Sequence, residues 1–270
     1  MGYAITVIDG EPLVLTEQMY LASQNPATSS PFHASHNVRR FVYGGQDLVI
    51  KEPGLFASLI NTYYAAQDAD FLASRNYFVS GRSQINAEAE KLLFLQSQDL
   101  RLAPKLIDHN PKKGQLVREY IHGKTFRQMS IEEQLDSVHH IVSLVEKVHR
   151  EGIAIGDAHV KNVMHSDCDG QYLWLDFDGR FDESIPVIAQ ANDVIKLVYS
   201  TFTESKDMVL TRQMGESLGH YGVEHVRNVA RVLVDHIGYS PGLWWATRVS
   251  RKEHRAIKEL MMDSLQLYSG

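Results

Sequence analysis

The segment 152–178, GIAIGDAHVKNVMHSDCDGQYLWLDFD, constrains the fold more than any other part of the chain. Asp157 precedes Asn162 in a polar loop, and Asp176 follows the strand-like run 172–175. A polar loop next to a strand end that carries a carboxylate is typical of a functional site. Phosphoryl transfer from a nucleotide uses such groups, since one Asp accepts the hydroxyl proton while an Asn and a second Asp hold Mg²⁺.

The motif GDAHVKN followed by LDFDG resembles the catalytic and metal-binding loops of the protein-kinase-like fold. Its Gly-Asp-x-His-x-x-Asn form is closer to the aminoglycoside, choline and RIO-type kinases than to the common His-Arg-Asp form. The Asp-Phe-Asp-Gly-Arg ending is similar to that of the bacterial lipopolysaccharide kinases that phosphorylate Kdo or heptose.

This resemblance implies an α+β protein-kinase-like fold with two lobes. The small N-lobe, residues 1–120, would carry an antiparallel sheet and one main helix and would bind the nucleotide. The larger helical C-lobe, residues 121–270, would carry the catalytic loop, the metal site and the substrate region.

The resemblance also implies a role for each polar residue of the loop. Asp157 would orient or deprotonate the acceptor hydroxyl, and Asn162 and Asp176 would hold Mg²⁺. His159 stands where many protein kinases have Lys and small-molecule kinases have His, so it would contact the γ-phosphate or brace the loop. Lys161 is a basic neighbour that we include in the catalytic set.

Several positions depart from the family pattern. Ile155 stands where His is usual, which puts the bracing of the loop in question. Asp178 replaces the Gly of Asp-Phe-Gly, which argues against a flipping regulatory segment and suggests help in metal or substrate binding. The segment 23–37 has no G-x-G-x-x-G motif; Ser29 and Ser30 could approach phosphates there, although a plain surface loop is the simpler interpretation.

Two apolar segments, 38–43 and 46–51, are separated by Gly44-Gly45 and predict a hairpin. The second ends Leu-Val-Ile-Lys, which resembles the V-A-I-K strand whose lysine pairs with the α and β phosphates. In the helix predicted over 85–98, Glu88 lies beside the apolar stripe. An isolated buried charge is costly, so we expect Glu88 to pair with Lys51. The alternative is that Glu88 stays solvated.

Three further segments are assigned mainly by their place in the chain. LVREYIHGKTF resembles the hinge between lobes, where the backbone of Glu119 and Ile121 would bind adenine. Residues 52–84 exceed the link that a minimal kinase needs and form a candidate substrate-recognition insert. Asp193, in a helix predicted over 190–202, resembles the buried Asp that accepts hydrogen bonds from the catalytic-loop backbone; a simple helix N-terminal charge is the alternative.

Composition excludes several other classes of protein. The 270 residues, 44% hydrophobic and 22% charged, suffice for one large domain or two lobes. A net charge of −6 argues against broad nucleic-acid binding. The single cysteine, Cys168, precludes an internal disulfide and suits a reducing compartment, and no run approaches the roughly 18 apolar residues of a membrane span. We expect a cytoplasmic protein with at most peripheral contact with the inner membrane.

Together these patterns predict a kinase that uses ATP and Mg²⁺ and transfers the γ-phosphate to a hydroxyl. The expected acceptor is a sugar of the lipopolysaccharide inner core, free or lipid-linked, or a related small molecule. Two alternatives stay open. One is a RIO-like or effector-type protein Ser/Thr kinase, and the other, motivated by the missing glycine loop and by Ile155, is a pseudokinase that acts as a scaffold for a partner.

Overall fold

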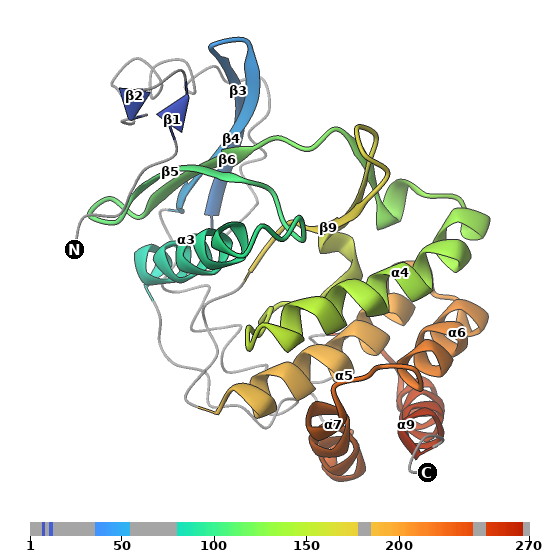
Figure 1. Ribbon diagram of the computed structural model, residues 1–270. Coiled ribbons are helices and arrows are strands. Elements are labelled where there is room, and N and C mark those ends of the chain that lie inside the picture. Colours follow the sequence, from blue (N-terminus) through green and yellow to red (C-terminus); the bar gives the residue numbers. More distant parts are fainter. Residues whose placement is uncertain are drawn as a thin grey trace. The chain divides into compact units, whose positions relative to one another are not determined.

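The computed structural model describes residues 7–8, 11–12, 36–54, 80–177, 185–239 and 247–266. They belong to two compact units, one containing the described residues up to Ile121 and the other those from His122 onward. Strands predominate in the first unit and helices in the second (Figure 1). The α+β class that the sequence predicts is confirmed.

The first unit is built on a four-stranded antiparallel sheet with the order β3-β4-β6-β5. The strands are β3 (His36–Tyr43), β4 (Gln46–Pro53), β5 (Leu106–Asn110) and β6 (Gln115–Glu119). A separate pair, β1 (Val7–Ile8) and β2 (Glu11–Pro12), forms its own small sheet. One helix, α3 (Gly81–Ser97), contacts β4, β5 and β6.

The hairpin between β3 and β4 forms where Gly44-Gly45 predicts it. Tyr43 pairs with Gln46, and both glycines have positive φ, 57° and 78°, as a two-residue hairpin turn requires. Phe41, Leu48, Ile50, Ile107 and Val117 form the core of this sheet. The pairing places β4 between β3 and β6, so the backbone of β4 is hydrogen-bonded along both edges.

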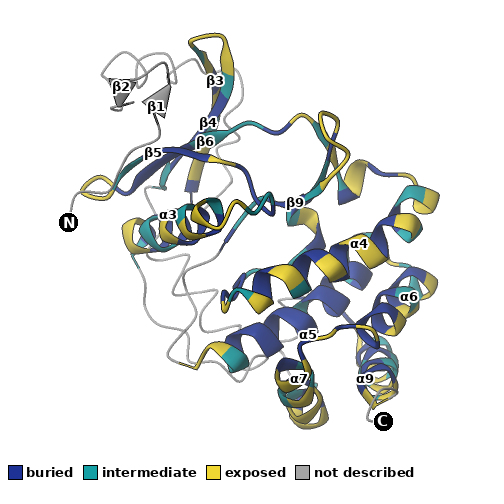
Figure 2. Ribbon diagram, in the orientation of Figure 1, coloured by how far each residue is buried: buried dark blue, intermediate teal, exposed yellow. Residues whose placement is uncertain are grey.

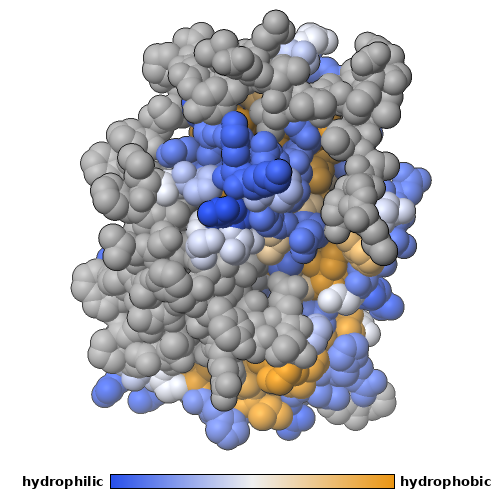
Figure 3. All heavy atoms as spheres, turned by 90° about the vertical axis from the view of Figure 1, so that its left-hand side faces the viewer, coloured by the Kyte–Doolittle hydropathy of each residue, from blue (hydrophilic) through white to orange (hydrophobic). Residues whose placement is uncertain are grey.

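Helix α3 begins at Gly81, four residues before the start predicted at Ile85. The Ser80 side chain accepts the Ser83 N–H at 3.2 Å and thus caps the helix. Several exposed residues of this helix and of the β5–β6 turn are charged, among them Arg82, Lys112 and Lys113, and Figure 3 shows a hydrophilic patch on one face of the described residues. Most of the predicted insert, residues 55–79, lies outside the described residues.

The second unit contains five long helices among its described residues, together with a three-stranded sheet. The helices are α4 (Ile131–Arg150), α5 (Pro186–Ser205), α6 (Met208–Leu218), α7 (Glu224–His236) and α9 (Arg251–Gln266). The sheet has the order β7-β8-β9, with β7 (Gly123–Thr125), β8 (Val163–Ser166) and β9 (Tyr172–Trp174). Two 3₁₀ turns lie between β7 and β8 in sequence, η2 (Phe126–Gln128) directly after β7 and η3 (Val160–Asn162) directly before β8.

Helix α5 forms the centre of this unit. It contacts α6, α7, α9 and η3, and 13 of its 20 residues are buried. Figure 2 shows α5 as mostly buried, whereas α4 alternates between buried and exposed faces. No helix in the described part of the chain has the length and apolar character needed to cross a membrane.

Candidate active site

Lys51 and Glu88, the two residues that the sequence pairs, form a buried ion pair. Lys51 Nζ on β4 lies 2.5 Å from Glu88 Oε2 on α3. The two residues are 4% and 0% exposed, so the solvated alternative for Glu88 is wrong. Two charges withdrawn from water in this way require each other, because removing one would leave the other buried without compensation.

Glu119, a predicted adenine contact, ends β6 and uses its side chain within the first unit. Its carboxylate accepts two hydrogen bonds from the Arg101 guanidinium, at 2.5 and 2.8 Å, and a third from the Lys105 N–H at 3.2 Å. Burial alone would raise the pKa of Glu119, but these donors outweigh it and the pKa lies below its usual value. Ile121, the second predicted contact, is 6% exposed.

The carboxylate of Asp157 is held by two donors in the second unit. Asn162 Nδ2 donates to the Asp157 carbonyl at 3.2 Å and to Oδ2 at 3.3 Å, which joins two residues that the sequence assigns to one site. Lys196 Nζ on α5 lies 2.6 Å from Asp157 Oδ1. Lys196 is a site residue that the sequence analysis missed.

Asp193 anchors the backbone that leads into Asp157. Its carboxylate, which is buried, accepts the N–H of Ile155 at 2.6 Å and that of Gly156 at 2.8 Å. His149 Nε2 lies 3.1 Å from Asp193 Oδ2, and the Tyr221 hydroxyl lies 2.5 Å from His149 Nδ1. The loop is therefore braced although position 155 is Ile, because a His at the end of α4 contacts the anchoring carboxylate.

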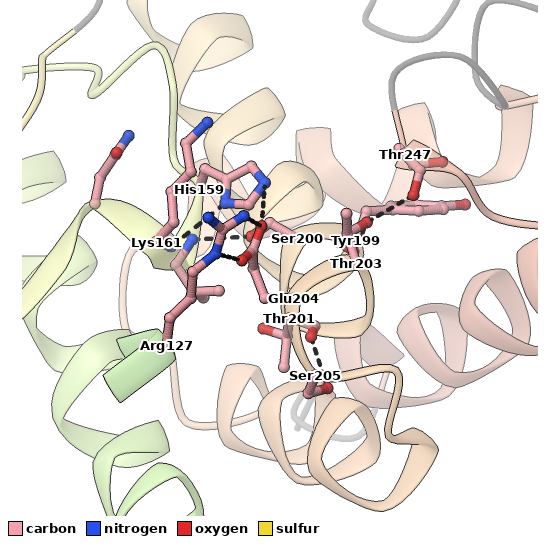
Figure 4. Close-up of polar contacts among 12 residues, drawn as sticks. Arg127, His159, Lys161, Tyr199, Ser200, Thr201, Thr203, Glu204, Ser205 and Thr247 are labelled. Atoms are coloured by element: carbon pink, nitrogen blue, oxygen red, sulfur yellow. Dashed lines mark hydrogen bonds and ion pairs between the residues drawn. The ribbon is translucent and has the colours of Figure 1, made fainter. Parts of the chain in front are cut away.

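His159 uses both ring nitrogens inside the second unit (Figure 4). Nδ1 accepts the Lys161 N–H at 3.3 Å, and Nε2 lies 3.4 Å from Glu204 Oε1. Burial lowers the pKa of His159 to about 4, with the charge on Lys161 acting in the same direction. A neutral imidazole engaged on both sides suits loop bracing better than a contact with the γ-phosphate.

Glu204 joins the loop that carries Asp157 and His159 to η2. The guanidinium of Arg127 makes a two-point contact with its carboxylate, in which Arg127 Nε bonds to Oε2 and Nη2 donates to Oε1 at 2.9 Å (Figure 4). Burial alone would raise the pKa of Glu204, but Arg127 and the neighbouring cations outweigh it and lower that pKa. The carboxylate is thus ionised and fixed beside His159.

Asn162 and Asp176 lie at adjoining strand ends. The Leu175 N–H donates to the Asn162 carbonyl at 2.8 Å, just beyond the pairing of Val163 with Trp174. One amide and one carboxylate suit Mg²⁺, which binds proteins through one or two carboxylates and takes its other ligands from phosphates and water. Among the described residues, no group of three His, Cys, Asp or Glu side chains is placed to hold a metal.

Three positions singled out in the sequence fall outside the described residues. They are Asp178, predicted to assist metal or substrate binding, and Ser29 and Ser30, predicted as possible phosphate contacts. Lys161 is described and exposed, and its side chain lies close enough to His159 to influence the pKa of that ring.

No protein-family model and no curated protein matches the chain. Among solved structures, it is similar to WaaP in complex with acyl carrier protein, with 12% identity, a TM-score of 0.46, and coverage of 86% of this chain and 88% of that one. An aminoglycoside-3'-phosphotransferase of type VIII is 14% identical, with a TM-score of 0.47 and coverage of 88% of this chain and 92% of that one. A PknI kinase domain from Mycobacterium tuberculosis is 15% identical, with a TM-score of 0.42 and coverage of 88% of this chain and 93% of that one.

Two sets of contacts within the chain characterise its two units. A small sheet carries a buried lysine paired with a helix glutamate, and a helical unit carries an Asp–Asn loop whose backbone is anchored by a buried Asp. The described residues form a sheet-based unit and a helical unit, which is the α+β class that the sequence predicts, and these contacts resemble those expected of a protein-kinase-like fold.

Proposed function

We propose that the chain is a phosphotransferase that uses ATP and Mg²⁺ and transfers the γ-phosphate to an alcohol hydroxyl. The ion pair between Lys51 and Glu88 carries the proposal. A buried ion pair is weak evidence for stability, but a lysine held by a helix glutamate is the arrangement that presents a cation to the α and β phosphates. We assign nucleotide binding to residues 1–120, with the backbone of Glu119 and Ile121 contacting adenine.

The second unit would supply the groups that act on the acceptor and on the metal. Asp157 would accept a hydrogen bond from the acceptor hydroxyl, and Asn162 and Asp176 would hold Mg²⁺, which neutralises charge on the phosphates when bound. His159 would brace the loop, and Lys161 would place a positive charge beside it. Residues 121–270 would thus contain the catalytic loop, the metal ligands and the substrate region.

For the acceptor we propose a sugar hydroxyl, of the lipopolysaccharide inner core or of a related small molecule. The support is the form of the two motifs, Gly-Asp-x-His-x-x-Asn and Asp-Phe-Asp-Gly-Arg, which resemble those of small-molecule and lipopolysaccharide kinases. A lipid-linked acceptor would bring a cytoplasmic enzyme into peripheral contact with the inner membrane.

The test is phosphate transfer by the purified chain. Mg·ATP is supplied with Kdo- or heptose-terminated glycolipids, with aminoglycosides and with Ser/Thr peptides, and products are identified by mass. We expect phosphate on a sugar. The Asp176→Asn variant should lose this transfer, whereas Asp167→Asn, at an exposed position in the turn between β8 and β9, should keep it. Phosphate on peptide alone would favour the protein-kinase alternative. Absence of both transfer and Mg·ATP binding by calorimetry would overturn the proposal and favour a scaffold.

A further inference from the structure

One face of helix α5 holds the catalytic loop at successive points. The face consists of Asp193, Lys196, Ser200 and Glu204, spaced three and four residues apart, and we call it the polar stripe of α5. From Asp193 to Glu204, these residues contact the N–H groups of residues 155 and 156, the Asp157 carboxylate, the Val160 N–H and the His159 ring.

Within the stripe, Lys196 bonds to the side chain that would face the acceptor. Its Nζ lies 2.6 Å from Asp157 Oδ1, and the side chains of the two residues are 15% and 16% exposed. Asn162 Nδ2 approaches the other carboxylate oxygen, Oδ2, at 3.3 Å. Each oxygen of Asp157 therefore has a donor of its own, one from a helix and one from the loop.

Two donors on opposite oxygens fix an orientation that the side chain would not keep by itself. The terminal torsion of an Asp is broad and has no single staggered minimum. Asn162 lies on the same short loop as Asp157, whereas Lys196 lies on a helix with 13 buried residues. Lys196 is thus the contact that ties the carboxylate plane to the rigid part of the unit.

We propose that Lys196 is a positioning residue for the transfer step, an inference that rests on the proposed function. It holds Asp157 Oδ1 so that the carboxylate meets the acceptor hydroxyl in one orientation. A carboxylate paired with an ammonium is a weaker base, but a loose phosphoryl-transfer transition state asks mainly for alignment of the nucleophile. Loss of Lys196 will then slow the transfer step without weakening nucleotide binding.

The test compares kcat, KM for ATP and thermal stability in matched variants. Lys196→Met keeps the length and removes the charge, Lys196→Arg keeps the charge, and Lys252→Met makes the same change at an exposed position on α9. For Lys196→Met we expect kcat to fall about 100-fold, the scale of a small misplacement of a reacting group, with KM for ATP unchanged. Lys196→Arg should recover part of the loss, and Lys252→Met should behave as the parent.

A double-mutant cycle shows whether Lys196 acts through Asp157. In Asp157→Asn, whose residual rate is measured first, adding Lys196→Met should change kcat by less than about threefold, because the two residues act as a unit. The double variant also controls for misfolding of Lys196→Met, because it has no Asp157 carboxylate that would be left without the Lys196 cation. Full additivity of the two losses would overturn the inference.

The remaining outcomes separate this inference from the proposed function. A parent protein that transfers phosphate, with kcat retained in Lys196→Met, would overturn the positioning role and leave the function intact. A loss in Lys196→Met that appears as a raised KM for ATP or as unfolding would also overturn it. A parent that neither binds Mg·ATP nor transfers phosphate would overturn the function and the inference together.

Discussion

His149 Nε2 lies 3.1 Å from Asp193 Oδ2, across 44 positions of sequence, and both side chains are almost fully buried. The same carboxylate accepts the N–H groups of Ile155 and Gly156. A single buried Asp thus serves a ring nitrogen and two backbone donors, which makes it the group on which the loop geometry depends most directly.

We predict that Asp193→Asn lowers the free energy of unfolding by about 2 kcal/mol or more, because an amide NH₂ would face a backbone donor and leave it buried without an acceptor. Urea denaturation of the variant and the parent measures the difference. Asp235→Asn, at an exposed position of α7, is the control and should change little. A loss at Asp193 no larger than that of the control would contradict the anchoring role.

Removing Lys51 should destabilise the first unit severely. In Lys51→Met the Glu88 carboxylate stays buried without its cation, and such a broken pair costs about 3–5 kcal/mol. The double variant Lys51→Met/Glu88→Leu removes both charges and should regain most of that loss. Denaturant midpoints for the two variants decide the matter; equal destabilisation in both would show that packing, and not the uncompensated charge, is responsible.

Arg127 should stabilise the protein through Glu204, whose side chain is only 5% exposed. Arg127→Gln removes the two-point contact, and because the Arg127 side chain is 63% exposed to screening by water, we expect a loss of about 1 kcal/mol. Introducing Glu204→Gln as well removes the charge that Arg127 compensates, so the second substitution should cost less in the Arg127→Gln background than in the parent. Thermal melts of the four proteins give the coupling directly.

His159 should make the folded state less stable in acid. Its pKa falls from 6.5 to about 4 on folding, through burial and the nearby Lys161, while Asp157 and Glu204 oppose the change. Between these values the unfolded chain binds a proton that the folded chain does not. Stability therefore declines as the pH drops from about 6.5 towards 4, by up to about 3 kcal/mol.

The check on this pH dependence is a comparison with His159→Gln. The stability advantage of the parent over the variant should shrink between pH 7 and pH 4, and the His159 ring resonances should titrate below pH 5 in NMR spectra. A ring that titrates near 6.5 would contradict the burial argument.

The parts of the site that were predictable had a local signature. Spacing predicts that Asp157 and Asn162 lie together, since one short loop carries both, and the hydrogen bonds from Asn162 Nδ2 to Asp157 confirm this contact; the role of Asp176 stays a prediction. The pairing of Lys51 with Glu88 followed from helical periodicity and the cost of burying a lone charge. In each case the spacing within one segment, or the free-energy cost of burying a lone charge, was enough to select the residues.

The residues that escaped prediction act across the fold. Lys196 stands in an apolar run, VIKLVYS, where nothing marks it as a partner of a distant loop. Its only signal was helical: it follows Asp193 by one turn, on the same face. His149 and Glu204 likewise resemble ordinary helix-surface residues until the helices pack, because their contacts depend on which faces meet and not on neighbours in sequence.

The polar stripe of α5 couples the local unfolding of the helix to that of the loop. Four residues of one helix make five contacts with one loop, so neither can open by itself, since fraying of α5 removes the acceptors that hold the loop amides. Exchange of the amide hydrogens at residues 155, 156 and 160 should then follow the rate of the buried centre of α5, and the loop and the helix will melt as a single cooperative block.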